Sequence, residues 1–321
     1  MDIQLLSSFR YLLETAYNKL NIADNRLLCG LQILEEDLSK NYKIHPEVYG
    51  AHWQLMLAMK KNNVSRILYI IDNFTFPEST NSYSIGIFPQ PDTGIVNEQL
   101  IRDTLDQQHL QAYGSSIDAT SPSIELVQSS SELINNVFKR IQQVLPDVAA
   151  EIETYITKIS LIDSKELSAG TSFPVFGLMY LHYIKDYQNW TAYLEHLVHE
   201  AAHHHLFAVI ATENVFERDS EKKFYSPLRL EPRPMSAIFH QMFVLSRVIY
   251  VVSEFQKAYP ESIELKSVNT AYKNKTDDPS FQKKFFMAAD TIAKNACLTQ
   301  TGDLLFHQCC KLVENAEIVY S

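Results

Sequence analysis

The chain contains little glycine, few cysteines and no long apolar run, and each shortage excludes a class of protein. Only 8 of its 321 residues are glycine and 12 are proline, which argues against a glycine-rich nucleotide-binding loop and against long disordered arms. No apolar run is long enough to span a bilayer, so no membrane segment is predicted. The N-terminal stretch MDIQLLSSFRYLLETAYNKL lacks a basic region before an apolar core, which predicts a structural helix rather than a signal peptide.

The cysteines and the charges narrow the class further. Cys309 and Cys310 are adjacent, and neither Cys29 nor Cys297 belongs to a CxxC motif. This usage is typical of a reducing compartment, so we expect a cytoplasmic protein. Acidic residues outnumber basic residues by 38 to 28, which gives a formal net charge of −10. Because an acidic surface repels phosphate groups, we expect no nucleic-acid partner. The oligomeric state stays open.

Apolar residues are plentiful, at 46% of the chain, and most of them recur with the period of an α-helix. Residues 73–95 are predicted to be loop and short strand, and the Gln/Ser-rich part of residues 96–122 to be a surface loop. Two further short strands, joined by a polar loop, are expected at residues 157–163 and 175–182. Helices are predicted at residues 1–72, 123–158 with a break at Pro146, 191–211, 235–257, 279–296 and 302–316.

This pattern predicts a mainly α (α+β) fold, in which a helical bundle packs beside a small β-sheet. Residues 1–122 would form an N-terminal helical layer and loop, which could bind a peptide. Residues 123–321 would form the catalytic region, continuous with the first segment in one domain.

The sequence HEAAH at residues 199–203 gives the strongest chemical signal. On a helix, His199 and His203 lie on one face, where two imidazole nitrogens can bind one metal ion. Glu200 is next to His199 and can reach a water molecule on that ion. His196 shares the same face and would line the cavity. Because so short a pattern also arises by chance, the alternative is a set of core histidines satisfied by hydrogen bonds.

A third ligand would decide the class of metal site. The metzincin continuation is absent, because Leu206 and Val209 occupy its glycine and final histidine positions. The nearest later glutamates are too close to the motif, and Glu231 lies in a proline-rich extended segment. His240, early in the next apolar helix, is a better candidate, although a lone histidine there is usually a core residue. Three neutral imidazoles suit Zn(II) with one open position and Fe(II) with two or three.

Four segments together resemble the HExxH-type peptide-modification proteins, which occur beside precursors of ribosomally made, post-translationally modified peptides. The segments are SAGTSFPVFGLMYLHY, LVHEAAHHHL, FYSPLRLEPRPMSAIFHQMF and LTQTGDLLFHQCC, within roughly residues 125–316. Members of this family are understood as Fe(II)- and 2-oxoglutarate-dependent peptide β-hydroxylases. The family usually reads PWR-x-D-P-R-P where this chain has Leu228 for Trp and Glu231 for Asp. These departures bear on substrate specificity more than on metal binding.

The resemblance implies that His199, His203 and His240 bind Fe(II), with 2-oxoglutarate as cosubstrate and O₂ as oxidant. The implied function is β-hydroxylation of a side chain in a precursor peptide. Two alternatives stay open from the residues alone. One is a Zn(II)-dependent peptidase with Glu200 as the catalytic base, and the other is a non-catalytic metal- or peptide-binding module.

A 2-oxoglutarate enzyme also needs a cation for the distal carboxylate of its cosubstrate. Arginine binds a carboxylate through two parallel hydrogen bonds, which makes Arg229 and Arg233 candidates. The alternative is that one or both pair with a local carboxylate such as Glu231. Tyr225 and Ser172 could add hydroxyl contacts to the same ligand.

Overall fold

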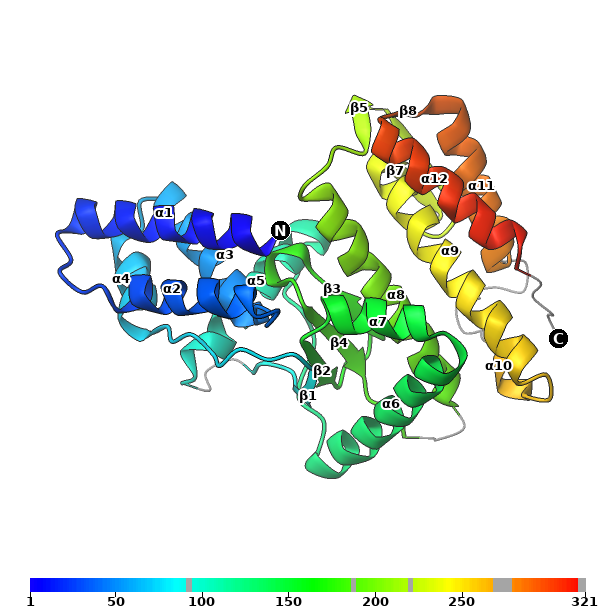
Figure 1. Cartoon of the computed structure of the whole chain (residues 1–321), viewed down its shortest axis with the longest axis horizontal. Helices are drawn as coiled ribbons and strands as arrows, with labels where there is room; N and C mark the ends of the chain where they lie inside the picture. Colours follow the sequence, from blue (N-terminus) through cyan, green and yellow to red (C-terminus); the bar gives the residue numbers. More distant parts are fainter. Residues whose placement is uncertain (91–93, 186–188, 219–221, 268–278, 317–321) are drawn as a thin grey trace. The chain divides into compact units, whose positions relative to one another are not determined.

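The computed structural model of the chain describes residues 1–90, 94–185, 189–218, 222–267 and 279–316 (Figure 1). These residues form twelve α-helices, one short 3₁₀ helix and small sheets of two to four strands. The predicted fold class, mainly α with a small β-sheet, is therefore confirmed. The chain divides into two compact units: unit 1 is Met1–Ser129 with Tyr155–Tyr183, and unit 2 is Ser130–Thr154 with Ile184–Ser321.

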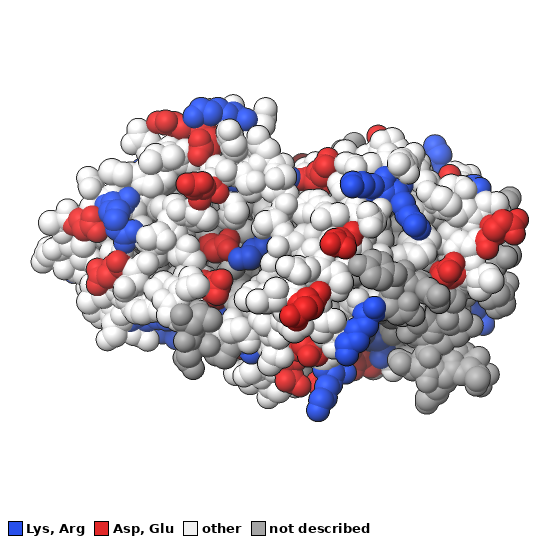
Figure 2. Space-filling view, turned by 90° about the horizontal axis from the view of Figure 1, so that it is seen from below, with Lys and Arg blue, Asp and Glu red and all other residues white. Residues whose placement is uncertain are grey.

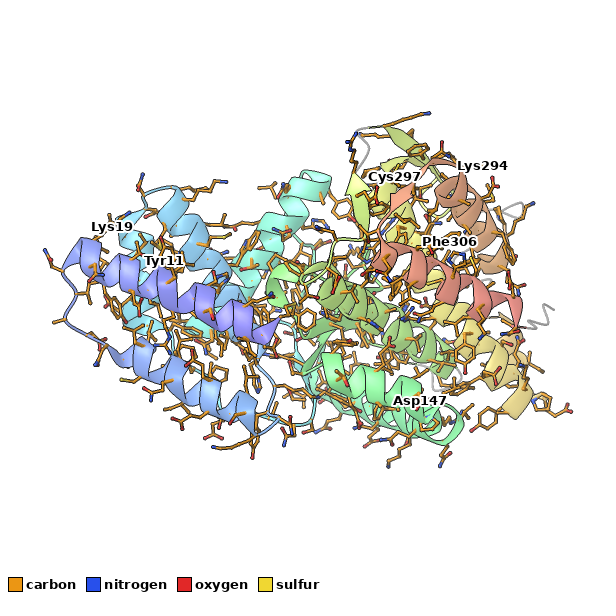
Figure 3. The ribbon with its side chains drawn as sticks, turned by 45° about the horizontal axis from the view of Figure 1, so that its top comes forward. Tyr11, Lys19, Asp147, Lys294, Cys297 and Phe306 are labelled. Carbon is orange, nitrogen blue, oxygen red and sulfur yellow. The ribbon has the colours of Figure 1, made fainter. Side chains whose placement is uncertain are left out.

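Five helices make up the first part of unit 1. Helix α3 lies against α1, α4 and α5 (Figure 1). Phe9 of α1 is fully buried, and its ring packs beside those of Phe74 and Phe76. Tyr11 and Lys19 also belong to α1, and Tyr11 is exposed (Figure 3). The helices are α1 (Asp2–Leu20), α2 (Arg26–Ser39), α3 (Pro46–Lys60), α4 (Val64–Asn73) and α5 (Val96–Tyr113).

Helix α5 occupies much of the segment that we predicted to be a polar surface loop, so that prediction was wrong. Polar residues dominate the helix, but Leu100, Ile101 and Leu105 recur at helical spacing and are buried. Such a narrow apolar stripe still supports a helix when its one buried face packs on a core. Gly114 ends the helix in the left-handed conformation, with a φ of 80°, which glycine adopts without strain.

The sheet of unit 1 has the strand order β1-β2-β4-β3. Strands β1, β2 and β4 are parallel, and β3 is antiparallel to β4. The strands are β1 (Ser84–Ile87), β2 (Lys158–Ile162), β3 (Ala169–Thr171) and β4 (Leu178–His182). Strands β2 and β4 match the two predicted strands, whereas β3 lies in the segment predicted to be a loop. Because β1 pairs with β2, unit 1 contains residues from both sides of the expected boundary at residue 122.

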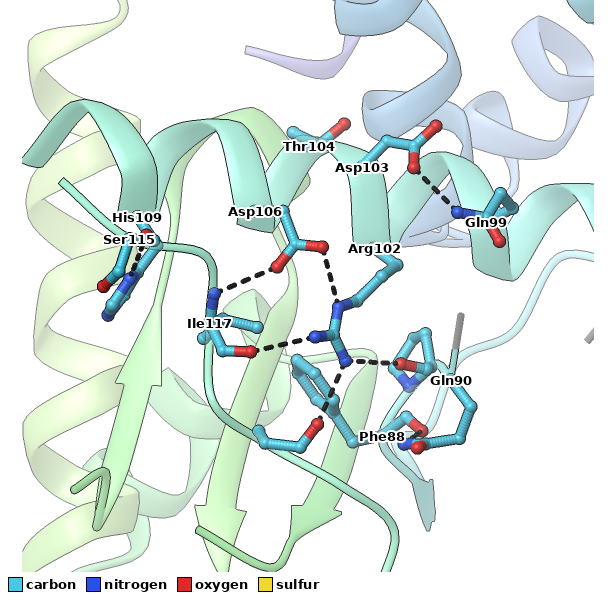
Figure 4. Close-up of polar contacts among 12 residues, drawn as sticks. Phe88, Gln90, Gln99, Arg102, Asp103, Thr104, Asp106, His109, Ser115 and Ile117 are labelled. Atoms are coloured by element: carbon cyan, nitrogen blue, oxygen red, sulfur yellow. Dashed lines mark hydrogen bonds and ion pairs between the residues drawn. The ribbon is translucent and has the colours of Figure 1, made fainter. Parts of the chain in front are cut away.

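A buried arginine ties the segment after α5 to that helix (Figure 4). Arg102 donates from its two terminal nitrogens to the carbonyl oxygens of Ala119 at 3.0 Å and Ile117 at 2.9 Å. Its Nε donates to Asp106 at 3.0 Å, and Asp106 also accepts the backbone N–H of Ile117 at 3.0 Å. The guanidinium lies over the ring of Phe88. Neighbouring groups of unit 1 thus satisfy this buried charge.

A second charged pair of unit 1 joins α3 to the sheet. Glu47 is only 7% exposed, and it accepts a hydrogen bond from Lys158 Nζ at 2.6 Å. Burial alone would raise the pKa of Glu47. His45, whose Nδ1 lies 3.6 Å from the carboxylate, and the positive charge of Lys158 outweigh burial and lower this pKa to about 2.

Unit 2 is built around two long helices. Helix α9 lies against α8 on one side and against α11 and α12 on the other (Figure 1). Helix α6 begins in the last residues of unit 1 and continues into unit 2. The helices are α6 (Ile124–Val144), α7 (Pro146–Tyr155), α8 (Trp190–Ile210), α9 (Met235–Ala258), α10 (Ile263–Ser267), α11 (Phe281–Asn295) and α12 (Gln300–Glu314).

Two short antiparallel strand pairs complete unit 2, and the sequence did not predict three of their strands. They are β5 (Phe216–Arg218) paired with β8 (Cys297–Leu298), and β6 (Lys223–Ser226) paired with β7 (Glu231–Pro234). Strand β7 matches the extended proline-rich segment. Gly302 allows α12 to begin close to the first pair, because a Cβ there would lie 2.1 Å from the carbonyl oxygen of Val215.

Helix α9 is also the one described helix that is long and apolar enough, by length and composition, to cross a membrane. Of its most apolar window, 72% is buried inside the structure, as in the core helix of many soluble proteins. This helix is therefore weak evidence for a membrane span. On the face drawn in Figure 2, acidic and basic side chains are interspersed rather than gathered in one area of a single sign.

Candidate metal centre

The HEAAH motif lies in the middle of α8, a helix that is buried on most of its surface. Leu194, Leu197 and Ala201 are at most 1% exposed, and α9 packs along the helix. The polar side chains of the motif are therefore held inside unit 2 rather than on a solvated face. Buried imidazoles and carboxyl groups need hydrogen-bond partners or an ion.

His199, Glu200 and His203 form a cluster that could hold a metal ion. One potential ligand atom from each residue lies within 4.8 Å of those of the other two. The ring centroids of the two histidines are 4.9 Å apart, as their spacing of one helical turn requires. Glu200 is only 4% exposed.

His240, in the second turn of α9, completes the group of histidines. Its Nε2 forms a hydrogen bond with Nδ1 of His203, and the two ring centroids are 4.6 Å apart. Phe207 packs against both rings. Two ring nitrogens that face each other can share one proton or one metal ion. The predicted ligands His199, His203 and His240 therefore lie together in unit 2.

Glu195 is part of the cluster, and the sequence analysis did not consider it. It is 3% exposed, and its carboxylate oxygens lie 3.0 Å from Nδ1 of His199 and 2.6 Å from Nδ1 of His196. With Nδ1 of His199 donating to Glu195, Nε2 of that ring keeps its lone pair for a ligand. A carboxylate behind a histidine is the usual support of a metal ligand. The spacing of one turn between Glu195 and His199 was visible in the sequence.

The pKa values follow from burial and from these contacts. Burial would raise the pKa of Glu195, but the charges and hydrogen bonds of His196 and His199 hold it well below its usual range. Burial would lower the pKa of His199, but the hydrogen bond and charge of Glu195 raise it. Burial raises the pKa of Glu200 to about 7.

For His203 and His240, which face each other, no negative charge among the described residues offsets the effect of burial on the pKa. It lowers the pKa of His240 to about 4, and the charge of His199 adds to this effect. Burial and the charges of His240 and His199 lower the pKa of His203 well below its usual value. Both rings are therefore neutral near pH 7, which is the form that binds a metal ion.

The turn between β6 and β7 brings a positive charge to this cluster. The charge of Arg229 acts to lower the pKa of His203, and it opposes the rise in the pKa values of His199 and Glu200. No described residue forms an ion pair or a hydrogen bond with its guanidinium. Arg233, on β7, instead forms an ion pair with Glu231, which is the alternative that the sequence left open.

The two remaining predicted residues differ in position. Tyr225 lies on β6 opposite Pro232 and is 53% exposed. Ser172 belongs to unit 1, where its carbonyl oxygen accepts the backbone N–H of Val175 at the start of the short 3₁₀ helix. Ser172 is therefore not among the residues that unit 2 brings together.

No family model matches the chain, and no curated protein matches it either. Any functional assignment therefore depends on the residues of the cluster and on the resemblance of the motifs.

Proposed function

We propose that the protein is a cytoplasmic Fe(II)- and 2-oxoglutarate-dependent dioxygenase that β-hydroxylates a side chain of a ribosomally made precursor peptide. The observation that carries the proposal is that His203 of α8 belongs to a cluster with His199 that could hold a metal ion and also contacts His240 of α9. The charge of Arg229 beside this group supports a site for an anionic cosubstrate. The resemblance of the motifs supplies the reaction and the class of substrate.

The residues fit a transition metal. His203 and His240 direct one ring nitrogen each toward the other, and both are neutral near pH 7. His199 is oriented by Glu195 so that its second nitrogen is free. Imidazole donors suit Fe(II) and Zn(II) alike, so the donor set alone leaves the identity of the metal open.

When bound, Fe(II) would supply the redox chemistry that couples O₂ to the conversion of 2-oxoglutarate into succinate and CO₂. The side chains of the protein perform the other tasks. Glu195 fixes the tautomer and orientation of His199. Arg229 would bind the distal carboxylate through its guanidinium. The apolar walls of α8 and α9 exclude water, which strengthens these polar contacts.

One observation favours a second function, a Zn(II)-dependent peptidase. Burial raises the pKa of Glu200 to about 7, which suits a group that takes and returns a proton near neutral pH. In a peptidase, Glu200 would remove a proton from water. In the hydroxylase, Glu200 would hold a proton on its carboxyl group inside the site.

Succinate formation separates these two functions. The purified full chain would be given 2-oxoglutarate with Fe(II) or with Zn(II), first without O₂ and then in air. The proposal predicts succinate that requires both Fe(II) and O₂ and that disappears in His203→Ala. A matched control is His205→Ala on the same helix, because His205 pairs with Glu151 outside the cluster.

The peptidase would show the opposite pattern. Cleavage of a peptide library by the Zn(II) form alone, abolished by Glu200→Gln, would replace the hydroxylase with the peptidase. A chain that binds neither metal ion would refute both functions.

A further inference from the structure

Two buried donor atoms near the start of α9 have no hydrogen-bond partner among the residues that the structure describes. They are Nε2 of Gln241, directly after His240, and Nε of Arg233, on the strand that leads into α9. Gln241 is only 8% exposed. A buried donor without a partner is unfavourable, and most buried polar groups have one. An acceptor that comes from outside the chain could satisfy Nε2 of Gln241.

The other end of the Gln241 amide is occupied, and it holds the turn that carries Arg229. Ser226 Oγ donates to Oε1 of Gln241 at 2.7 Å, and the same Oγ accepts the backbone N–H of Arg229 at 3.1 Å. Leu230, in this turn, has a φ of 58°, which a leucine side chain rarely adopts. The Gln241–Ser226 pair thus fixes a strained turn to the helix of His240.

Several cationic and uncharged donors lie around this turn, beside the carboxylate of Glu231. Among the described residues, the guanidinium of Arg229 has no hydrogen-bond or ion-pair partner, and Arg233 has one negative partner, Glu231. The first turn of α9 has no side-chain cap, so its backbone N–H groups add further donors at the same end of the helix. A carboxylate is the ligand class that satisfies uncharged and cationic donors together.

We propose that Gln241 belongs to a carboxylate-binding subsite, in which its Nε2 donates to the carboxylate that Arg229 binds. Through Oε1 and Ser226, Gln241 also positions the turn that carries Arg229. The ligand class follows from the donors of the turn, and the identity of the carboxylate as 2-oxoglutarate rests on the proposed function.

The test measures binding rather than turnover. Isothermal titration calorimetry of the full chain without O₂, with and without Fe(II), would use two probes, 2-oxoglutarate and succinate. Succinate has two carboxylates on a chain that is one carbon shorter, and it lacks the keto group that chelates a metal. The variants are Gln241→Leu, Gln241→Glu and Ser226→Ala. The matched control is Gln256→Leu, on the same helix, because Gln256 donates to the carbonyl oxygen of Leu265.

The subsite predicts a graded loss of affinity for both probes. Gln241→Leu is expected to weaken binding about tenfold to a hundredfold, because one charge-assisted hydrogen bond disappears. Gln241→Glu keeps an acceptor for Ser226 but replaces the donor with a negative charge, so it is expected to weaken binding by more than about a hundredfold. Ser226→Ala is expected to show a smaller loss, and Gln256→Leu none.

A purely structural role for Gln241 would give a different pattern. Imidazole, a neutral ligand for the metal, should bind all metal-loaded variants equally if only the carboxylate contact is lost. Equal weakening by Gln241→Leu and Gln241→Glu, or weaker imidazole binding in both, would overturn the subsite.

The remaining outcomes separate this inference from the proposed function. Wild-type affinity for 2-oxoglutarate in both Gln241 variants would overturn the subsite and leave the dioxygenase intact. If binding of both probes depends on Gln241 but 2-oxoglutarate gains nothing from Fe(II), the subsite stands and the dioxygenase falls. Absence of any carboxylate binding by the wild type would overturn the subsite.

Discussion

Glu47 in unit 1 and Glu200 in unit 2 are both buried carboxyl groups, yet their pKa values move in opposite directions. Around Glu47, the nearby His45 and the charge of Lys158 outweigh burial, and the pKa falls to about 2. Around Glu200, burial outweighs the charges of His199 and His196, and the pKa rises to about 7. The contrast shows that unit 1 holds Glu47 in its charged form with its own Lys158. Unit 2 instead gathers histidines and carboxyl groups in a pattern that suits an ion from outside.

The largest effect is expected when a buried charge of unit 1 loses its hydrogen-bond network. Arg102→Met removes the donor to Asp106 and to two backbone carbonyls. We expect the free energy of unfolding of unit 1 to fall by about 3–5 kcal/mol, because Asp106 keeps a charge without its partner. Denaturant unfolding of a Trp190→Phe background would report unit 1, because Trp53 then remains as the only tryptophan.

The matched control for Arg102 is Arg10→Met. Arg10 pairs with Glu35 at 2.9 Å, but both side chains are substantially exposed, at 32% and 42%. We expect this variant to lose less than about 1 kcal/mol. Equal losses in the two variants would contradict the claim that the buried network stabilises unit 1.

The second prediction concerns unit 2, where a buried carboxylate supports the candidate metal ligands. Glu195→Gln removes the negative charge between His196 and His199, and it replaces one of the two oxygens that contact these rings with an NH₂ group. We expect affinity for Fe(II) to fall about tenfold to a hundredfold, as when a carboxylate behind a metal-binding histidine is lost. Metal titration would measure this. Glu151→Gln, which removes a carboxylate that pairs with His205 instead, is expected to leave the affinity unchanged.

The third prediction uses pH to sharpen the comparison. The pKa of Glu47 is lower in the folded chain, at about 2, than its ordinary value of 4.5. Its contribution to stability is therefore complete above about pH 4.5 and is lost as the pH falls toward about 2. The free energy of unfolding, followed through Trp53, should fall more steeply with falling pH in the wild type than in Glu47→Gln. The same dependence of stability on pH in both proteins would show that Lys158 does not stabilise the charged form of Glu47.

The smallest effect is expected at an exposed ion pair of unit 2. Lys294, at the end of α11 (Figure 3), pairs with Asp290 at 2.7 Å, and both side chains are more than 60% exposed. Lys294→Met should change the free energy of unfolding by less than about 0.5 kcal/mol. Thermal unfolding at two salt concentrations would check this, and a large, salt-insensitive loss would contradict it.

The sequence predicted most of the helices, because their apolar residues recur with a clear period. Helix α8 spans Trp190–Ile210 where residues 191–211 were expected, and Pro146 does divide α6 from α7. Helix α5 was not predicted because its buried apolar stripe is narrow and most of its residues are polar. Strands β3, β5 and β6 are three or four residues long, and such short strands owe their form to pairing with distant segments rather than to their own pattern.

Some features of the candidate site could likewise be predicted from the sequence, and others could not. The spacing of His199 and His203 on one helix was readable in the sequence, since neighbours one turn apart share a face. The support from Glu195 and the bond between Ser226 and Gln241 depend on which atoms meet after folding. Among the described residues, Arg233 forms an ion pair with Glu231 and Arg229 forms none, and no local sequence pattern predicts this difference. The metal, the cosubstrate and the reaction stay predictions.

The central claim is that the histidines of α8 and α9 form one metal centre, and anaerobic Fe(II) titration of the full chain tests it most directly. We predict one high-affinity ion per chain in the wild type and in His205→Ala. In His203→Ala and in His240→Ala, this binding should be weakened by more than about a hundredfold, which exceeds the loss from removing a supporting carboxylate. Fe(II) affinity that is the same in His203→Ala as in the wild type would contradict the account.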